Sequence, residues 1–189
     1  MPSRPMPSAE PDACLNRRLR WRRPRALRAP EPAQAWLSDN GSLTRRLQAL
    51  GRFRVAPQYQ AMAVPRPEEQ RLLGLPPRQR ALIREVLLYL DDTPVVFARS
   101  VLPVESLTGA NRVLGHMARR SLGAELFRAP RAERRAVWYA RYPGALLPAG
   151  TDADGAWGRQ SRFEKRGHPL LVSEVFLPAL WQRLQSDVH

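Results

Sequence analysis

The stretch ALIREVLLYLDDTPVVFARSVLP, residues 81 to 103, predicts a β-hairpin. Two runs rich in β-branched, leucine and aromatic residues flank a short polar segment, and such runs bounded by turn residues are typical of strands. The segment from Asp91 to Pro94 supplies the turn, because aspartate and proline favour turn conformations. Strands joined by so short a connection must run antiparallel.

The segments around this hairpin extend the sheet. FRVAPQYQAMAV (53–64) is predicted to be a strand, in which Pro57 indicates an edge position or a bulge. AVWYARY (136–142) suits another strand, and GRQSRFE and PLLVSEVFL would form a final hairpin that turns at residues 165–168.

Short helices are expected between these strands. PAQAWL (32–37) can form one, and LTRRLQAL (43–50) has Ser42 as an N-cap and Gly51 as its end. SLTGANRVLGHM and SLGAELF indicate further short helical pieces, the second capped by Ser121. The whole pattern predicts an α+β fold, with a single antiparallel sheet flanked by helices.

The first 30 residues differ from the rest in composition. They contain six prolines, and residues 1–28 hold eight arginines against two acidic residues. Such a segment does not support a stable helix, because proline breaks helices and like charges repel. We expect a poorly ordered arm over residues 1–30, in contact with the body near Trp21, and one domain over residues 31–189.

The formal charge of +14 raises the question of nucleic acid. About half of the excess lies in the arm, and the basic residues are almost entirely arginine, with Lys165 the one lysine. Genome composition explains that skew as well as a phosphate-binding surface does, so we expect a solvated basic surface and no nucleic-acid partner.

The cellular setting follows from what the chain lacks. Its one cysteine, Cys14, cannot form an internal disulfide, and no apolar run is long enough to span a bilayer or serve as a signal. We therefore expect a cytoplasmic protein without membrane insertion, and a monomer because no unpaired apolar surface is evident.

Three charged residues interrupt apolar strand faces. Arg84 shares a face with Leu82, Val86 and Leu88, Arg99 shares one with Phe97 and Val101, and Glu174 lies within LLVSEVFLP. Buried ion pairs, or arginines that reach water at a sheet edge, are one interpretation. The other is a closed anion pocket, in which arginines bind substrate carboxylates through paired N–H donors.

Other kinds of site find little support. The three histidines lack the spacing of zinc ligands, and neither a nucleophile motif nor a glycine-rich phosphate loop is present. We therefore expect a site without metal or cofactor.

Several blocks in consistent order are similar to one enzyme family. IREVLLYLDDTPVVFARSVLP, SLGAELF, WGRQSRF and PLLVSEVFLPA, together with the earlier WLSDNGSLTRRL, resemble the chorismate pyruvate-lyases of bacterial ubiquinone synthesis, over about residues 33–180. The resemblance implies an antiparallel sheet whose helical flaps enclose the ligand. It also implies cofactor-independent cleavage of chorismate to 4-hydroxybenzoate and pyruvate, with slow release of an enclosed product.

The resemblance also assigns roles to residues. Arg84 would hold the benzoate carboxylate, with backbone groups of Leu43 and Leu122 around it, although this position of Leu43 is methionine in another family member. Glu174 would meet the phenolic hydroxyl, and Arg99 would hold the second substrate carboxylate. Arg84, Arg99 and Glu174 are thus the expected catalytic residues.

Two alternatives to the lyase stay open. One is a ligand-sensing domain of the same fold, although the proline-broken arm cannot form the helix-turn-helix module that precedes such domains. The other is a nucleic-acid-binding protein that uses the arm, which predicts steeply salt-dependent binding lost on removing residues 1–28. The lyase hypothesis predicts full activity after that removal.

Overall fold

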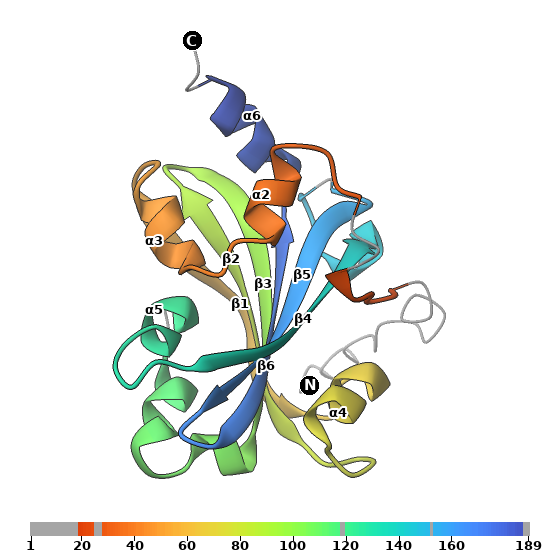
Figure 1. The fold of residues 1–189 in the computed structure, drawn as a ribbon, viewed down its shortest axis with the longest axis vertical. Helices are drawn as coiled ribbons and strands as arrows, with labels where there is room; N and C mark the ends of the chain where they lie inside the picture. The colour runs from red at the N-terminus through yellow and green to blue at the C-terminus, as the bar shows by residue number, and fades with distance from the viewer. Residues whose placement is uncertain (1–18, 25–27, 118–119, 152, 187–189) are drawn as a thin grey trace, which may run out of the picture.

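A six-stranded sheet organises the computed structural model, which describes residues 19–24, 28–117, 120–151 and 153–186 (Figure 1). The strands are β1 (Phe53–Ala63), β2 (Ala81–Leu90), β3 (Thr93–Pro103), β4 (Glu133–Tyr142), β5 (Ala156–Lys165) and β6 (His168–Phe176). Their order is β1-β2-β3-β6-β5-β4, and all neighbours are antiparallel. The helices are α2 (Ala33–Leu37), α3 (Leu43–Gln48), α4 (Pro67–Leu73), α5 (Leu122–Leu126) and α6 (Pro178–Ser186), with 3-10 helices η2 (Val104–Leu107), η3 (Gly109–His116) and η4 (Gly144–Leu146). The predicted α+β class with one antiparallel sheet is confirmed.

The β2–β3 hairpin forms where it was predicted, with a tighter turn. Thr93 and Pro94 already belong to β3, which leaves Asp91 and Asp92 as the loop. Asp91 adopts a φ of 54°, and its carboxylate accepts a hydrogen bond of 3.1 Å from the backbone N–H of Arg52. Aspartate tolerates this left-handed conformation better than most residues. The prediction that Pro57 marks an edge position or a bulge is also confirmed, since β1 is an edge strand whose register shifts beside Pro57.

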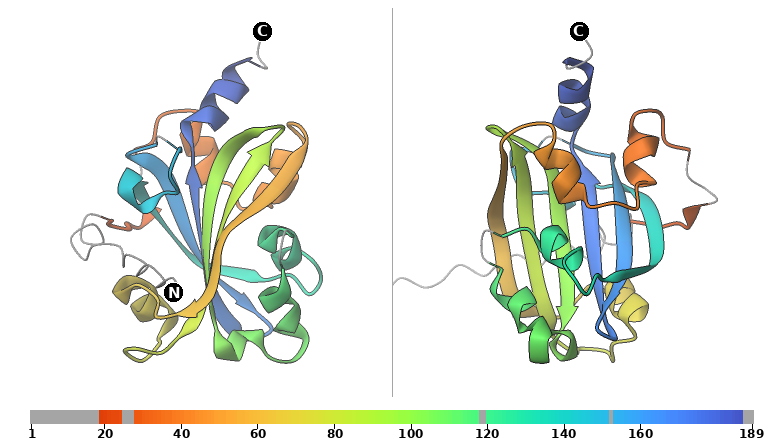
Figure 2. Two further views of the ribbon diagram at one scale, coloured as in Figure 1. Left: turned by 180° about the vertical axis from the view of Figure 1, so that it is seen from behind. Right: turned by 60° about the vertical axis from the view of Figure 1, so that its left-hand side comes forward.

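Helices cover both faces of the sheet. Figure 1 shows α3 and α5 on one side and α4 on the other, and the views in Figure 2 agree. We call the side under α2, α3 and α5 the cavity face, which includes Arg84, Val86, Ser100, Val172 and Glu174. The opposite side is the back face, which includes Ile83, Leu87, Phe97, Arg99 and Val175. Buried apolar clusters lie on both faces, so each strand of the central hairpin is apolar on both sides.

Two α-helices, α4 and α6, and the short 3-10 helix η4 were not predicted from the sequence. The proline-rich link after β1 contains α4, which begins with Pro67 and ends at Gly74, where φ is 67°. Proline at the first helical position and glycine just past the end are signals of a helix, so the sequence held the information. At the end of the chain, α6 buries Leu180 against the sheet.

The last part of the arm lies on the edge strand β4. Leu19 is buried, and the ring of Trp21 lies 6.3 Å from that of Tyr142. Arg22 exchanges two backbone hydrogen bonds of 2.8 Å with Tyr139. The expected contact near Trp21 is therefore present, whereas the predicted disorder falls mostly on residues 1–18 and 25–27, outside the described residues. No helix in the described ranges is long and apolar enough to cross a membrane.

Candidate active site

A cavity lies between the cavity face and the first turns of α3 and α5. Strands β1, β2, β3, β5 and β6 form its floor, and the two helices and the start of β4 form its walls. It is lined by Gly41, Leu43, Thr44, Val55, Arg84, Val86, Leu88, Ala98, Ser100, Ser121, Leu122, Gly123, Leu126, Phe127, Arg134, Phe163, Val172 and Glu174. Four of the five residues predicted for the site, all except Arg99, therefore share this cavity.

Arg84 provides a buried cation on β2. Only 2% of the residue is exposed, and one Nη donates a hydrogen bond of 2.8 Å to the backbone carbonyl of Arg120. Burial lowers the pKa of the guanidinium from its ordinary value. Arginine nevertheless stays charged at neutral pH, because its ordinary pKa lies so far above 7.

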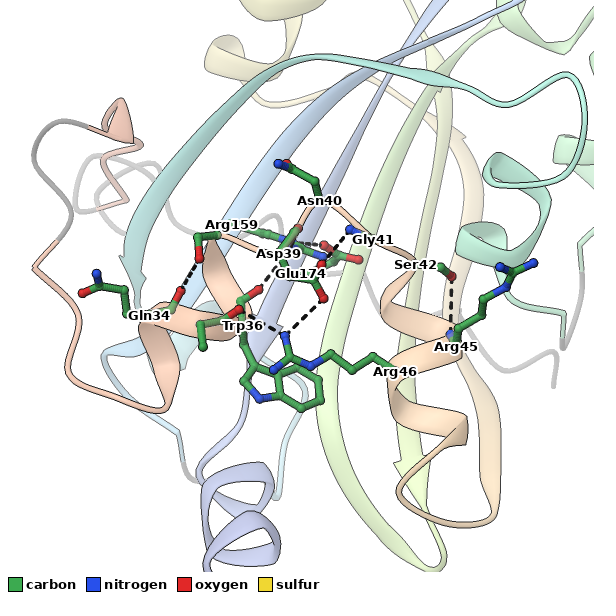
Figure 3. A network of polar contacts seen from close by, with 12 residues as sticks. Gln34, Trp36, Asp39, Asn40, Gly41, Ser42, Arg45, Arg46, Arg159 and Glu174 are labelled. Atoms are coloured by element: carbon green, nitrogen blue, oxygen red, sulfur yellow. Dashed lines mark hydrogen bonds and ion pairs between the residues drawn. The ribbon is translucent and has the colours of Figure 1, made fainter.

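Glu174 lies two strands away, paired with Arg159 on β5. Its Oε2 accepts a hydrogen bond of 2.5 Å from Nε of Arg159, whose side chain is 1% exposed (Figure 3). One Nη of Arg159 also donates to the backbone carbonyls of Trp36, at 3.1 Å, and Asp39, at 2.6 Å. Arg159 thus ties the carboxylate of Glu174 to the segment between α2 and α3, which covers this end of the cavity.

The segment between α2 and α3 has bonds of its own. Oδ1 of Asp39 accepts the N–H of Gly41 at 2.7 Å, and Oδ2 accepts Nη1 of Arg46 at 3.1 Å. Burial opposes ionisation of Asp39, but these two donors outweigh it and hold its pKa below 3.8. The guanidinium of Arg46 also lies 3.8 Å from the ring centre of Trp36. These contacts fix the entry into α3, and with it the position of Leu43.

Leu43 and Leu122 occupy equivalent places on the two helical walls. Each is the first residue of its helix, after Ser42 and Ser121 respectively, and both serine side chains cap as predicted. The first N–H groups of a helix have no acceptor within the helix, so such positions can donate to a ligand. Thr44 and Ser121 share a hydrogen bond of 2.5 Å that joins the walls.

Arg99 lies away from the cavity, on the back face. Its Nε and Nη2 bond the two carboxylate oxygens of Glu69 on α4, at 2.8 and 2.9 Å, and Nη1 bonds Glu85 at 2.7 Å. The cause is the register of the hairpin: Ser100 is the partner of Arg84, so the preceding residue, Arg99, points the other way. This placement corrects the expectation that Arg99 joins the substrate site.

Two arginines at the cavity were missed by sequence reasoning. Arg159 lies in the block WGRQSRF and shares a strand face with Ser161 and Phe163, so alternation could have indicated it. Arg134 falls in an arginine-rich run without clear alternation and gave no signal. In the described ranges no three His, Cys, Asp or Glu side chains gather where they could hold a metal ion.

Comparison with known proteins identifies relatives along most of the chain. A model of the family described as chorismate lyase matches residues 15–186. A probable chorismate pyruvate-lyase of Alcanivorax borkumensis is 57% identical over 166 residues, which cover 87% of this chain and 78% of that protein. One from Pseudomonas aeruginosa is 46% identical, covering 78% of this chain and 84% of its own length, and one from Thiobacillus denitrificans is 44% identical, covering 83% and 88%.

Solved structures with low sequence identity share the fold. A gene product of Staphylococcus aureus superposes with a TM-score of 0.53 at 16% identity, covering 73% of this chain and 88% of that one. PhnF from Mycobacterium smegmatis superposes with a TM-score of 0.52 at 16% identity, covering 75% and 66%. At this identity the likeness concerns the fold alone.

Proposed function

The chain belongs to the chorismate lyase family, and on that premise we propose that it is a chorismate pyruvate-lyase that forms 4-hydroxybenzoate and pyruvate for ubiquinone synthesis. The observation that carries the proposal is a partly enclosed cavity with Arg84 and Glu174 both in its lining. A buried arginine suits a carboxylate, and a buried carboxylate suits a hydroxyl group. These are the two polar ends of 4-hydroxybenzoate.

The spacing of the strands fits such a ligand. Arg84 and Glu174 lie on β2 and β6 with β3 between them, and Glu174 lies two residues along the strands from the register position of Arg84. Two strand spacings of about 4.8 Å and two rises of about 3.3 Å put their Cα atoms about 12 Å apart, and the two side chains reach toward each other across this distance. Between them the floor carries Ala98 and Ser100, whose small side chains leave room for a flat ring. The benzoate carboxylate would meet Arg84 and the N–H groups of Leu43 and Leu122.

The reaction needs positioning more than a strong acid or base. Cleavage of the ether at ring carbon 3, with loss of the hydrogen on carbon 4, makes the ring aromatic, which supplies the driving force. That hydrogen passes, directly or by a short relay, to the methylene of the enolpyruvyl group, which leaves as pyruvate. Glu174 would hold the hydroxyl on carbon 4 and favour the conformer in which the side chain lies over the ring.

The walls of the cavity suggest how the product leaves. If a ligand under α3 and α5 leaves between the two helices, the hydrogen bond between Thr44 and Ser121 must break. We therefore expect product release to be slower than the chemical step, as is common for enzymes with closing lids.

Turnover tests the proposal directly. The purified protein is incubated with chorismate in the presence of a chelator and without added metal or cofactor, while 4-hydroxybenzoate and pyruvate are followed together. We expect equimolar products and a first turnover faster than later ones. No product from protein shown to be folded would refute the proposed function.

A further inference from the structure

The proposed reaction raises a problem of charge in the cavity. Chorismate carries two carboxylates, and Arg84 can serve only the one on the ring. Arg99, which the sequence suggested for the enolpyruvyl carboxylate, lies on the back face with Glu69 and Glu85. If the chain has the proposed function, on which this inference rests, another residue must bind the enolpyruvyl carboxylate in place of Arg99.

Arg134 is the remaining arginine that lines the cavity. It lies near the start of β4, and its guanidinium carbon is 5.0 Å from the ring centre of Phe163. Nη1 donates to the backbone carbonyl of Asp39 at 2.9 Å and to the side-chain oxygen of Asn40 at 3.1 Å. Both acceptors are neutral groups, so neither forms an ion pair with the guanidinium.

One donor of Arg134 has no acceptor. Its Nε is buried and makes no hydrogen bond, and no ion pair among the described residues includes this side chain. A buried donor without a partner is costly, since the group has lost water and gained nothing in exchange. Such an atom at a cavity wall is a place where a ligand oxygen would be stabilised.

The net charge of the cavity agrees with a dianionic ligand. Glu174 is compensated by its own bond to Arg159, which leaves Arg134 without a carboxylate. The lining residues Arg84 and Arg134, each +1, and Glu174, −1, carry a formal charge of +2 when Arg159, the partner of Glu174 beside the cavity, is included; nearby Asp39 is paired with Arg46. The two carboxylates of chorismate would balance this charge, whereas 4-hydroxybenzoate, with one, would leave +1.

We propose that Arg134 binds the enolpyruvyl carboxylate of chorismate and so distinguishes the substrate from the product. Its position suits this role, because Arg134 and Glu174 both line the cavity. Arg134 also lies at the same end as Glu174, since Arg134 and Arg159, the partner of Glu174, donate to the same backbone carbonyl of Asp39. The ether carbon of chorismate is adjacent to the hydroxyl carbon that Glu174 would hold, so the side chain starts at this end of the ring.

The electrostatics of Arg134 support the proposal. Burial, and then the charge of Arg159, lower the pKa of Arg134 from its ordinary value, and the carboxylates of Glu174 and Asp39 only partly oppose this. A substrate carboxylate beside Nε would offset both the burial of this charge and its repulsion by Arg159. Loss of that carboxylate as pyruvate would restore them, which favours departure of pyruvate before the aromatic product.

Binding of two stable ring ligands separates this role from a purely structural one. Both are 4-hydroxybenzoates with an ether at carbon 3: 3-(carboxymethoxy)-4-hydroxybenzoate carries a second carboxylate, and 3-ethoxy-4-hydroxybenzoate does not. In Arg134→Met we expect the affinity for the first to fall about 100-fold, as when one partner of a buried charge pair is lost. The affinity for the second should stay nearly unchanged.

A neighbouring residue provides the matched control. Arg135 lies beside Arg134 on β4 but is exposed and pairs with Glu133 and Glu164, so Arg135→Met should affect neither ligand. Calorimetric titration of wild type and both variants gives the comparison. Equal losses for both ligands in Arg134→Met, or none for either, would overturn the proposal.

A second variant and an assay of wild-type turnover complete the test. If Arg134→Met does not fold, Arg134→Lys retains the charge but loses the paired donors, and a smaller loss restricted to the dianionic ligand is expected. Wild-type turnover of chorismate is measured alongside. Absent turnover would count against the proposed function, whereas normal turnover with no preference for the dianion would count against the role of Arg134 alone.

Discussion

Replacing Arg99 with methionine should destabilise the fold without impairing the chemistry. Arg99 and Glu69 form a paired salt bridge of 2.8 and 2.9 Å on the back face, with side chains 10% and 4% exposed. Removing one partner of a buried ion pair costs about 3 to 5 kcal/mol, because the other charge stays buried and unpaired. For a domain of this size that corresponds to a fall in melting temperature of about 6 to 20 °C.

The effect should depend on pH with a definite sign. Burial opposes ionisation of Glu69, but Arg99 outweighs it and holds the pKa of Glu69 below 4.5. In the wild type this contribution is complete above pH 4.5 and is lost as the pH falls through the folded-state pKa. Without Arg99, only Arg66 opposes the effect of burial, so the pKa of Glu69 rises, and the deficit of the variant is largest at neutral pH and shrinks toward pH 4.5.

Denaturant unfolding followed by tryptophan fluorescence measures the difference, and turnover is assayed below the transition. The double variant Glu69→Gln with Arg99→Met should recover part of the lost stability, because it removes the unpaired carboxylate. The glutamine oxygen can still accept the backbone N–H of Arg66, which donates to Glu69 at 2.9 Å in the wild type. If Arg99→Met unfolded at the wild-type midpoint but turned over chorismate much more slowly, the back-face assignment would be refuted.

Two further changes test the walls of the cavity and the arm. A Cβ at Gly123 would lie 2.9 Å from Oγ1 of Thr44, so Gly123→Ala should break the hydrogen bond between Thr44 and Ser121. The loss should weaken 4-hydroxybenzoate binding by about 1 kcal/mol, and unchanged affinity in a titration would contradict this. Deletion of residues 1–28 should cost about 3 kcal/mol more stability than deletion of 1–18, because it removes the buried contacts of Leu19 and Trp21. Equal unfolding midpoints would show that these contacts do not matter.

Alternation along the strands predicted part of the site. It singled out Arg84 and Glu174 as charges on apolar faces, and the resemblance to a family added Leu43 and Leu122; the structure brings these four residues to one cavity. Alternation describes each strand separately, however, and does not say which face of one strand continues which face of the next. That depends on register, and a shift of one residue would have put Arg99 beside Arg84.

Other features depended on contacts between distant segments. One partner of Arg99, Glu69, lies on α4, and the proline-rich flanks of this helix hid it despite Pro67 and Gly74 at its ends. Arg134 lies on an edge strand, between Glu133 and Arg135, so no apolar alternation in the sequence marks it as a residue that faces inward. Its importance comes from Asp39 and Phe163, which are distant in sequence and meet it only in the folded chain.

Single-turnover cleavage of chorismate by Glu174→Gln tests the central claim most directly, with Glu69→Gln as the matched control. Both carboxylates pair with a buried arginine, on opposite faces of one sheet. Glu174→Gln should slow the chemical step about 100-fold or more, as loss of a preorganised electrostatic contact does elsewhere, while folded Glu69→Gln should react at the wild-type rate. A Glu174→Gln variant with nearly the wild-type rate and normal product affinity would contradict the account.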